Sequence, residues 1–318
     1  MKIAILICTR NRPSELNLLL SSIARLEKPP IQVVIASSGA DITEVLSKFR
    51  GDLPISHVHT ALYGQIRQKI LGIEAIDILA EWTLFLDDDV LLPSDTLGKL
   101  DELIELEAKN SPEVPIGIGL STPATSHLYH GNKIRRVIAR IFYLESEKLG
   151  HILLSGHPVS YLESKQIINT KWLNGISAWN SGTLSFYGSD FLDSRYSAFE
   201  DVIFSYSQSK KGSLIFAPDI KIDFQQMTAT DLSNPVIFEA ASYWRLKFVL
   251  ANREFSKFKF LWSQIGRCIF FIYSSKCSPK ILIKRTLKSA EILVELIFQL
   301  LIKKNANWSL DRHCKLIK

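Results

Sequence analysis

Residues 2–86 alternate between two hydrophobic periods, and no other feature of the sequence constrains the fold as much. Short apolar runs typical of buried strands occupy 2–8, 31–36, 55–58 and 82–86. Segments with apolar residues at helical spacing lie between these runs, at 13–26, 41–49 and 63–79. Strands that alternate with helices in this way favour a mostly parallel sheet with helices on both faces. The sequence therefore predicts an α/β fold.

Polar residues stand where three of these predicted strands end. Thr9 follows the first strand, Ser37 the second, and the triplet Asp87, Asp88 and Asp89 the fourth. Ligands bind beyond the carboxyl ends of the strands in sheets of this kind. We therefore expect these side chains to line one crevice.

Three consecutive carboxylates repel one another unless a cation or several hydrogen-bond donors lie among them. On an extended chain Asp87 and Asp89 point to the same side, where they can share a divalent metal ion. Asp88 then points away, and we expect it to hydrogen-bond to the backbone or to a sugar. An ordinary acidic turn is the alternative, because Asp is common in loops and at helix N-caps.

Composition and charge divide the chain into two parts. Of the 318 residues 47% are apolar, enough for a substantial core, and the formal net charge is +6. Residues 245–318 contain sixteen Lys and Arg against four Asp and Glu, a balance of +12, so residues 1–244 carry 6 − 12 = −6. Four cysteines without C-x-x-C spacing fit a reducing, cytoplasmic environment. We expect an α/β body over 1–225 and a basic, aromatic helical region over 226–318.

Four motifs, at 5–13, 62–69, 85–89 and 199–202, occur in an order and spacing that resemble the family 2 glycosyltransferases with the GT-A fold. The resemblance covers about residues 1–225 and implies a nucleotide-binding half, 1–120, and an acceptor and catalytic half, 121–225. It also implies an inverting transfer of a sugar from a nucleotide-diphosphate donor to a hydroxyl acceptor, with Mn²⁺ or Mg²⁺ as cofactor. The acceptor would be a glycan or a lipid-linked molecule in polysaccharide or cell-envelope glycan synthesis.

The resemblance assigns roles to residues that match these motifs. Thr9 and Arg10 would line the nucleotide pocket, and Arg67 would reach the base or the diphosphate. Asp87 and Asp89 would bind the ribose and the metal. Asp88 is counted among the donor-binding residues.

The remaining assignments fall in the second half of the body. Asp201 would be the catalytic base, with Glu200 beside it as the second choice. Simple capping of the helix that begins there is the alternative for both. Trp179, in the glycine-containing segment 173–186, either stacks on the donor sugar or belongs to the core.

The sequence departs from the family pattern at two places. Ser37 and Asp41 follow the second strand, where acidic residues usually hold the base and ribose. Many GT-A enzymes add a late histidine to the metal, but the only histidine after the 199–202 motif is His313. Asp223 or Gln225 falls near the position expected for that ligand.

The C-terminal region mixes aromatic and basic residues over 255–273 and continues into a helical stripe: Ile283, Leu287, Ala290, Val294, Ile297 and Leu301. Such a region over 255–304 suits peripheral attachment to the inner face of the plasma membrane. A helical hairpin packed on the body or on a second subunit of a homo-oligomer is the alternative. The basic residues Lys133, Arg135, Arg136 and Arg140 either meet an anionic acceptor or form an ordinary helix surface. We expect no nucleic acid partner, because no recognised fold for one is present.

Two other functions remain open. A nucleotidyltransferase can use a similar α/β body, and a non-catalytic carbohydrate- or nucleotide-binding module can carry the same crevice. Release of a nucleoside diphosphate from a nucleotide sugar distinguishes a glycosyltransferase from both.

Overall fold

The structure, a computed structural model, describes residues 1–62, 64–110, 113–123, 133–184, 198–225, 234–273 and 279–302. The chain forms two compact units, which are described separately. The first comprises Met1–Pro123, Leu162–Arg195 and Phe204–Met227, and the second Ala124–Tyr161, Tyr196–Ile203 and Thr228–Lys318. The last change of unit lies close to the boundary expected after residue 225. Two stretches expected in the body, 124–161 and 196–203, group instead with the C-terminal helices.

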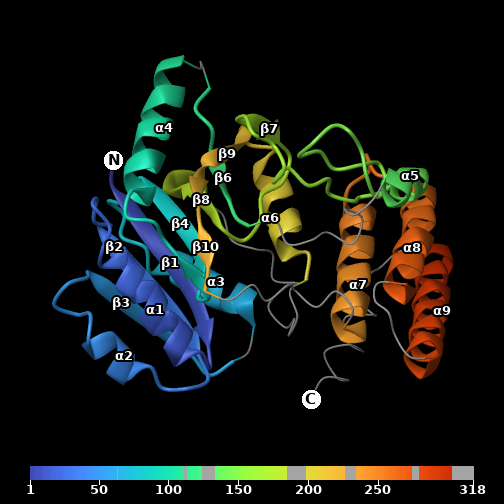
Figure 1. Ribbon diagram of the computed structural model, residues 1–318, viewed down its shortest axis with the longest axis horizontal. Coiled ribbons are helices and arrows are strands. Elements are labelled where there is room, and N and C mark those ends of the chain that lie inside the picture. The colour runs from blue at the N-terminus through green and yellow to red at the C-terminus, as the bar shows by residue number, and fades with distance from the viewer. Residues whose placement is uncertain are drawn as a thin grey trace. The chain divides into compact units, whose positions relative to one another are not determined.

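The first unit is built around an eight-stranded sheet flanked by helices (Figure 1). The strands are β1 (Ile3–Arg10), β2 (Gln32–Ser38), β3 (Ile55–Thr60), β4 (Trp82–Asp87), β6 (Gly117–Ser121), β7 (Ile168–Thr170), β8 (Ser177–Asn180) and β9 (Leu214–Lys221). The helices are α1 (Pro13–Ile23), α2 (Thr43–Ser47), α3 (Gln65–Glu74) and α4 (Thr96–Asn110), with a short 3-10 helix at Ser181–Thr183. The first three α-helices and four strands are those that the alternating periods predict.

The sheet has the order β3-β2-β1-β4-β8-β6-β9-β7. Four of its seven neighbouring pairs are parallel, namely β3-β2, β2-β1, β1-β4 and β6-β9. Strand β8 runs antiparallel to both of its neighbours, and β7 runs antiparallel to β9. Six of these eight strands therefore point the same way. A separate antiparallel pair joins β5 (Val90–Leu91) to β10 (Asp223–Phe224).

Different helices pack on the two faces of the sheet. Ile5 and Ile7 of β1 pack in a core with leucines of α1 and α4. The opposite face of β1 carries Leu6, which meets α3 at Gly72. A Cβ at Gly72 would lie 2.2 Å from Leu6 Cδ1, so the missing side chain lets α3 approach the sheet.

The second unit is largely helical. It contains α5 (Lys133–Ile141), α7 (Pro235–Ala251), α8 (Lys257–Ile272) and α9 (Pro279–Ile302), and α6 (Glu200–Gln208) begins in it. Helices α7, α8 and α9 share a core in which Phe238 and Phe271 stack at 4.2 Å between ring centroids. Within the described part of the chain, no helix is both long and apolar enough to span a bilayer.

Helix α9 packs through a different face from the one its apolar stripe suggests. Its buried residues are Arg285, Ser289, Ile292, Leu296 and Gln299. The expected stripe from Ile283 to Leu301 lies on the outside, with both of these residues exposed. Arg285 is buried instead and donates from Nη1 to the carbonyl of Phe271 at 3.4 Å. The spacing correctly groups the residues of one face but does not say which face is buried.

Candidate active site

The carboxyl ends of β1, β2 and β4 meet at one edge of the sheet. In the sheet register Cys8 lies opposite Asp87, and Thr9 lies opposite Ser37. Three segments that are far apart in the sequence thus deliver polar side chains to the same place, as the sequence predicts.

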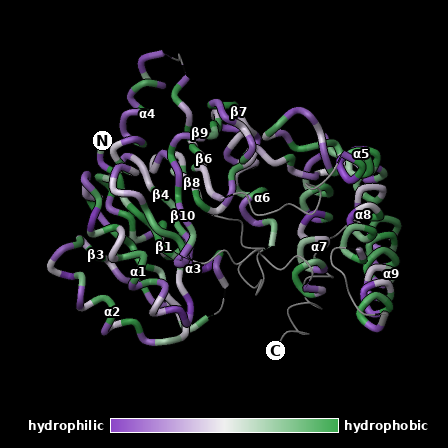
Figure 2. The backbone as a smooth tube through the Cα atoms, in the orientation of Figure 1, coloured by the Kyte–Doolittle hydropathy of each residue, from purple (hydrophilic) through white to green (hydrophobic). Residues whose placement is uncertain are grey.

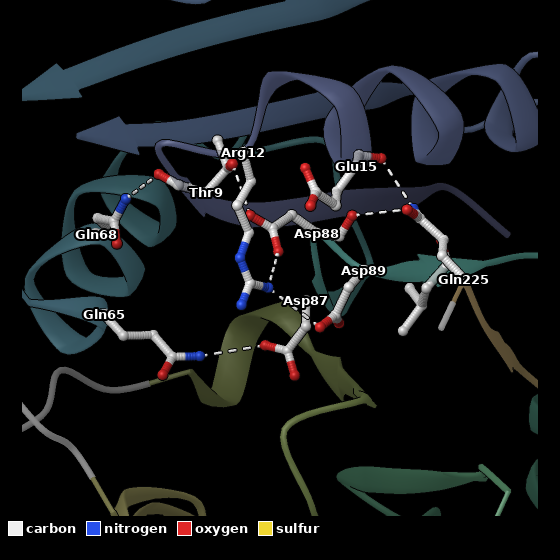
Figure 3. A network of polar contacts seen from close by, with 10 residues as sticks. Thr9, Arg12, Glu15, Gln65, Gln68, Asp87, Asp88, Asp89 and Gln225 are labelled. Atoms are coloured by element: carbon white, nitrogen blue, oxygen red, sulfur yellow. Dashed lines mark hydrogen bonds and ion pairs between the residues drawn. The ribbon is translucent and has the colours of Figure 1, made fainter. Parts of the chain in front are cut away.

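The aspartate triplet forms the turn between β4 and β5, and its members face different ways (Figure 3). Asp88 is only 5% exposed, whereas Asp87 and Asp89 are half-buried. Thr9 Oγ1 donates to Asp88 Oδ2 at 2.7 Å. Arg12 Nη1 donates to Asp88 Oδ1 at 3.0 Å and to Asp89 Oδ2 at 3.1 Å. The repulsion within the triplet is therefore reduced by a guanidinium group and a hydroxyl from the first strand and its loop.

Burial dominates the electrostatics of Asp88. It raises the pKa of this carboxyl, while the hydrogen bonds from Thr9 and Arg12 and the charge of Arg12 act in the opposite direction. Arg12 itself is half exposed, so its side chain is accessible to solvent. Among the residues that the structure describes, no three or more His, Cys, Asp or Glu side chains are grouped to hold a metal ion.

Gln225 holds the backbone of the turn. Its Nε2 atom lies 2.9 Å from the carbonyl oxygen of Glu15 and 3.2 Å from those of Asp88 and Val90. Its own backbone N–H donates to the Asp89 carbonyl at 2.9 Å, continuing the β10-β5 pairing. The residue expected near a late metal ligand thus uses its amide nitrogen to fix the shape of the turn (Figure 3).

Helix α3 closes the other side of the triplet. Gln65 Nε2 donates to Asp87 Oδ1 at 3.2 Å. The buried Gln68 donates to the carbonyl oxygens of Thr9, at 2.6 Å, and Ala36, at 3.0 Å. The first turn of α3 is therefore tied to the ends of three strands. Arg67 lies between these two glutamines in the sequence and is half-buried.

The loops after β1 and β2 are joined directly. Arg10 is the last residue of β1 and is half-buried. Asn11 has a positive φ of 56°, and its Oδ1 accepts from the Ala40 N–H at 2.8 Å. Gly39 also has a positive φ, of 81°, and a Cβ there would lie 2.2 Å from Asn11 Oδ1. Glycine is required at this contact for both reasons.

Ser37 and Asp41 have specific partners at the end of β2. The hydroxyl of the buried Ser37 lies 2.8 Å from His57 Nε2 and 3.0 Å from His59 Nδ1, both on β3. Burial, followed by the charge of His59, lowers the pKa of His57. Asp41 accepts from the N–H and hydroxyl of Thr43, which lower its pKa. Their contact with a nucleotide stays a prediction.

Trp179 belongs to the core of the first unit. It is 1% exposed, and its Nε1 donates to Ser177 Oγ at 2.9 Å. Its ring meets Phe204 edge-on at 5.0 Å, and a Cβ at Gly117 would lie 2.6 Å from its Cζ3. We therefore assign Trp179 to packing, because a ring enclosed in this way has no free face for a sugar.

Glu200 and Asp201 open α6 in the second unit. Phe199, just before them, has a φ of 81°, an unusual conformation for a bulky residue, and its ring meets Phe248 at 5.6 Å. Glu200 is buried, and Asp201 is half-buried with Oδ1 accepting from the Val202 N–H at 2.8 Å. The helix N-terminus favours their negative charge. Because the triplet lies in the first unit, the predicted division of the reaction between these groups stays a prediction.

Residues 4–144 match the model of glycosyl transferase family 2, and this match contains the strand ends and the triplet described above. These residues form a glycosyltransferase family 2 domain. No curated protein matches the glycosyltransferase in sequence.

Solved structures share its GT-A fold. TarS 1-349 from S. aureus is 13% identical, with a TM-score of 0.52 over 93% of this chain and 90% of the other. The same protein in complex with UDP-GlcNAc gives a TM-score of 0.57 at 12% identity, over 93% of this chain and 82% of the other. The mannosyltransferase PcManGT from Pyrobaculum calidifontis was solved with GDP-Man and Mn²⁺. It is 12% identical and gives a TM-score of 0.54, over 99% of this chain and 80% of the other.

Three residues in the site of this glycosyltransferase were not expected from its sequence. Arg12 and Gln68 lie within the motifs at 5–13 and 62–69, but the resemblance gives them no role, and the sequence places Gln225 only near an expected metal ligand. Their partners are backbone carbonyls or carboxylates 32 to 210 positions away in the chain. Gln68 shares the buried side of α3 with Ile66, Lys69 and Gly72, so no apolar pattern in the sequence marks it.

Proposed function

We propose that the enzyme transfers a sugar from a nucleotide-diphosphate donor to a hydroxyl acceptor with inversion at the anomeric carbon. The observation that carries the proposal is the division of the triplet, in which Asp88 is buried and bonded while Asp87 and Asp89 remain partly exposed at the carboxyl end of β4. The donors named for the similar structures, UDP-GlcNAc and GDP-Man, support this class of substrate.

The residues at this edge fit a divalent cation in their chemistry. Asp87 and Asp89 offer carboxylate oxygens, which Mn²⁺ and Mg²⁺ prefer, and water and donor phosphates commonly complete such sites. Mn²⁺ in the PcManGT structure supports this proposal. When bound, the cation supplies positive charge for the departing diphosphate. Arg12 already bonds Asp89, so this guanidinium must share the carboxylate with a cation or move away.

The chain's own residues bind and orient the donor. Thr9 and Arg10 line the nucleotide side at the end of β1, and Arg67 on α3 meets the base or the diphosphate. Ser37 and Asp41 occupy the place of the usual base and ribose ligands. These five side chains lie on segments that α3 and the Asn11–Gly39 contact hold together.

Asp201 accepts the proton of the attacking hydroxyl, with Glu200 as the second choice. Inversion in one displacement requires a base on the face of the sugar opposite to the leaving diphosphate. The position of both carboxylates in the first turn of α6 supports the proposal, because it places two candidate proton acceptors side by side at the start of one helix.

The acceptor is proposed to be a glycan or a lipid-linked molecule of polysaccharide or cell-envelope synthesis. The enzyme would then act in the cytoplasm, peripherally at the inner face of the plasma membrane. A second subunit in a homo-oligomer is compatible with the same chemistry.

The test is release of nucleoside diphosphate from a panel of nucleotide sugars, with Mn²⁺ and with Mg²⁺. We expect one donor to be consumed, and failure with every donor would contradict the proposal and favour a binding module. Asp89→Ala should lose donor binding and turnover together. Asp201→Asn should keep donor binding, measured by calorimetry, and lose transfer; full activity of this variant would move the base to Glu200.

A further inference from the structure

Helix α5 turns an apolar face toward solvent. Ile134, Val137 and Ile141 are spaced by three and four residues, so they lie along one side of the helix. All three are exposed, Ile134 by 70%, while Ala139 is fully buried. The helix therefore packs through Ala139 and the half-buried Ile138 and leaves the other three aliphatic side chains outside, although burying them would be favourable.

Helix α8 extends this apolar face. Phe258 and Trp262 lie one turn apart, and Phe258 is 77% exposed. Trp262 Nε1 donates to the carbonyl of Ile141 at 2.8 Å, and its ring stacks on Phe142 at 5.1 Å. Helix α5 lies beside α8 within the second unit (Figures 1 and 2), and these two contacts bring their apolar side chains together.

We define the α5–α8 surface as six exposed side chains: Ile134, Val137, Ile141, Tyr143, Phe258 and Trp262. Tyr143 joins the two helices, because the Nζ atom of Lys259 lies 5.0 Å from the centre of its ring. The surface therefore combines aliphatic side chains with a tryptophan and a tyrosine, the two aromatic residues that prefer the boundary between lipid and water.

Positive charge surrounds this surface. Helix α5 contains four basic residues and α8 contains three, a total of 4 + 3 = 7, and neither helix contains a carboxylate. The exposed Lys133 and Lys257 begin the two helices. Arg140 donates to Glu147 at 2.9 Å, so the segment after α5 compensates its charge. Arg267 donates to Gln264 and lies over the ring of Phe238 on α7, so it packs with the helical core and is not part of this surface.

We propose that the α5–α8 surface rests on an anionic lipid bilayer. Its apolar side chains would enter the headgroup boundary, while the lysines and arginines would meet lipid phosphates. A second copy of this chain is less suitable, because a symmetric contact would bring equal positive charges together. The surface lies partly outside the 255–304 region suggested by the sequence, since it needs α5 and does not use α9. The proposal does not depend on the sugar transfer.

Flotation with two kinds of vesicle tests the proposal. The full chain should bind vesicles that contain phosphatidylglycerol at least about tenfold better than vesicles of phosphatidylcholine alone, and high salt should weaken binding. Ile134→Glu and Phe258→Glu should each reduce binding about tenfold or more, because a carboxylate replaces an apolar group and opposes the lipid charge. Both positions are exposed, so these variants should fold, as circular dichroism would confirm.

Two matched variants serve as controls. Ile78→Glu changes a residue that is 97% exposed in the first unit, and Leu301→Glu changes one that is 79% exposed on α9. Neither should alter binding.

Quenching of tryptophan fluorescence by brominated lipid should also fall in Trp262→Phe, which locates the contact directly.

The outcomes separate the alternatives. Equal binding to both vesicles, or unchanged binding of the Ile134 and Phe258 variants, would overturn the proposal. Loss of binding in Leu301→Glu alone would assign the lipid contact to α9. Self-association in ultracentrifugation that Phe258→Glu abolishes would replace the bilayer with a second copy. Nucleotide-sugar turnover of the same variants without vesicles keeps any failure of the proposed enzyme activity distinct.

Discussion

Asp88 is buried, whereas its neighbours Asp87 and Asp89 remain partly exposed. Thr9 donates a hydrogen bond to one carboxylate oxygen of Asp88. Arg12 donates to the other and also to an oxygen of Asp89. Burial of a carboxylate is costly unless such donors are present. The turn therefore depends on single atoms of the first strand and its loop, and substitutions there should act on the turn from a distance in sequence.

Thr9→Val tests this dependence. Valine has nearly the same shape but lacks the hydroxyl, which leaves Asp88 Oδ2 without this donor. We expect the free energy of unfolding to fall by about 1–3 kcal/mol, measured by denaturant titration. Thr9→Ser keeps the hydroxyl and should cost less than half as much; equal losses in the two variants would attribute the effect to packing.

The triplet could be predicted from sequence because it follows a buried strand, and local order along the chain places it at a sheet edge. The partners could not be predicted in the same way. Nothing in the residues around Arg12 states that it will face Asp88, 76 positions later. Trp179 illustrates the reverse difficulty, because its neighbours in the sequence fit a sugar-binding segment while its neighbours in space enclose it.

Helices attach to the sheet at specific close contacts, and α3 depends on one glycine. Alternation of strand and helix was predictable from periodicity because the two periods differ clearly. For α9, the same kind of pattern correctly identified one face, but not whether that face packs inward. Periodicity describes a helix in isolation, whereas burial depends on what the remaining elements offer.

Gly72→Ala and Gly98→Ala form a matched pair that tests the close contact between α3 and the sheet. Alanine at Gly72 would meet Leu6 and should lower the free energy of unfolding by about 1–3 kcal/mol. No heavy atom outside the helix lies within 4 Å of a Cβ at Gly98 in α4, so alanine there should stabilise by about 1 kcal/mol through helix propensity. Thermal or denaturant unfolding measures both, and stabilisation by both would contradict the close contact.

Helix α4 is fixed to the start of the chain through Asp101. Its carboxylate accepts from Lys28 and, at 2.8 Å, from the Met1 amine. Partial burial acts to raise the pKa of Asp101, but these hydrogen bonds and charges outweigh it and lower the pKa. A lowered pKa contributes stability above the ordinary value of 3.8, and that stability is lost as the pH falls through the folded-state pKa.

Asp101→Asn should therefore destabilise the protein at pH 7 by about 1 kcal/mol, and the difference should vanish in strong acid. Unfolding titrations across this pH range measure it. Asp95→Asn removes an exposed i,i+4 pair between Lys99 and the residue just before the same helix, and it should change stability by less than about 0.5 kcal/mol. A pH-independent difference for Asp101→Asn would rule out the ion pair as its cause.

The whole molecule contains two units with separate cores, and each core contains a buried cysteine. Cys8 lies in β1, and Cys268 lies in α8, where burial raises the pKa of its thiol. Both thiols should resist labelling in the native protein. The reactivity of each thiol therefore measures unfolding of the unit that contains it.

We expect Cys8 and Cys268 to become reactive at different denaturant concentrations, as measured by thiol labelling followed by peptide mass spectrometry. Each unit can lose its own core, so cooperative unfolding of the two is not required. A single midpoint for both thiols would mean that the units unfold together. Labelling of either thiol in native buffer would contradict its burial.

Six strands of the described sheet run in one direction, so each of them ends at the edge that carries the aspartates. The oppositely directed β8 starts there, since Ser177 pairs with Phe85, and β9 continues to Gln225 at the same place. Loops from separate elements therefore decide what meets this edge, while the strands behind them need not change. Exchange of one such loop between related enzymes should alter the sugar or acceptor that is accepted, without redesign of the scaffold.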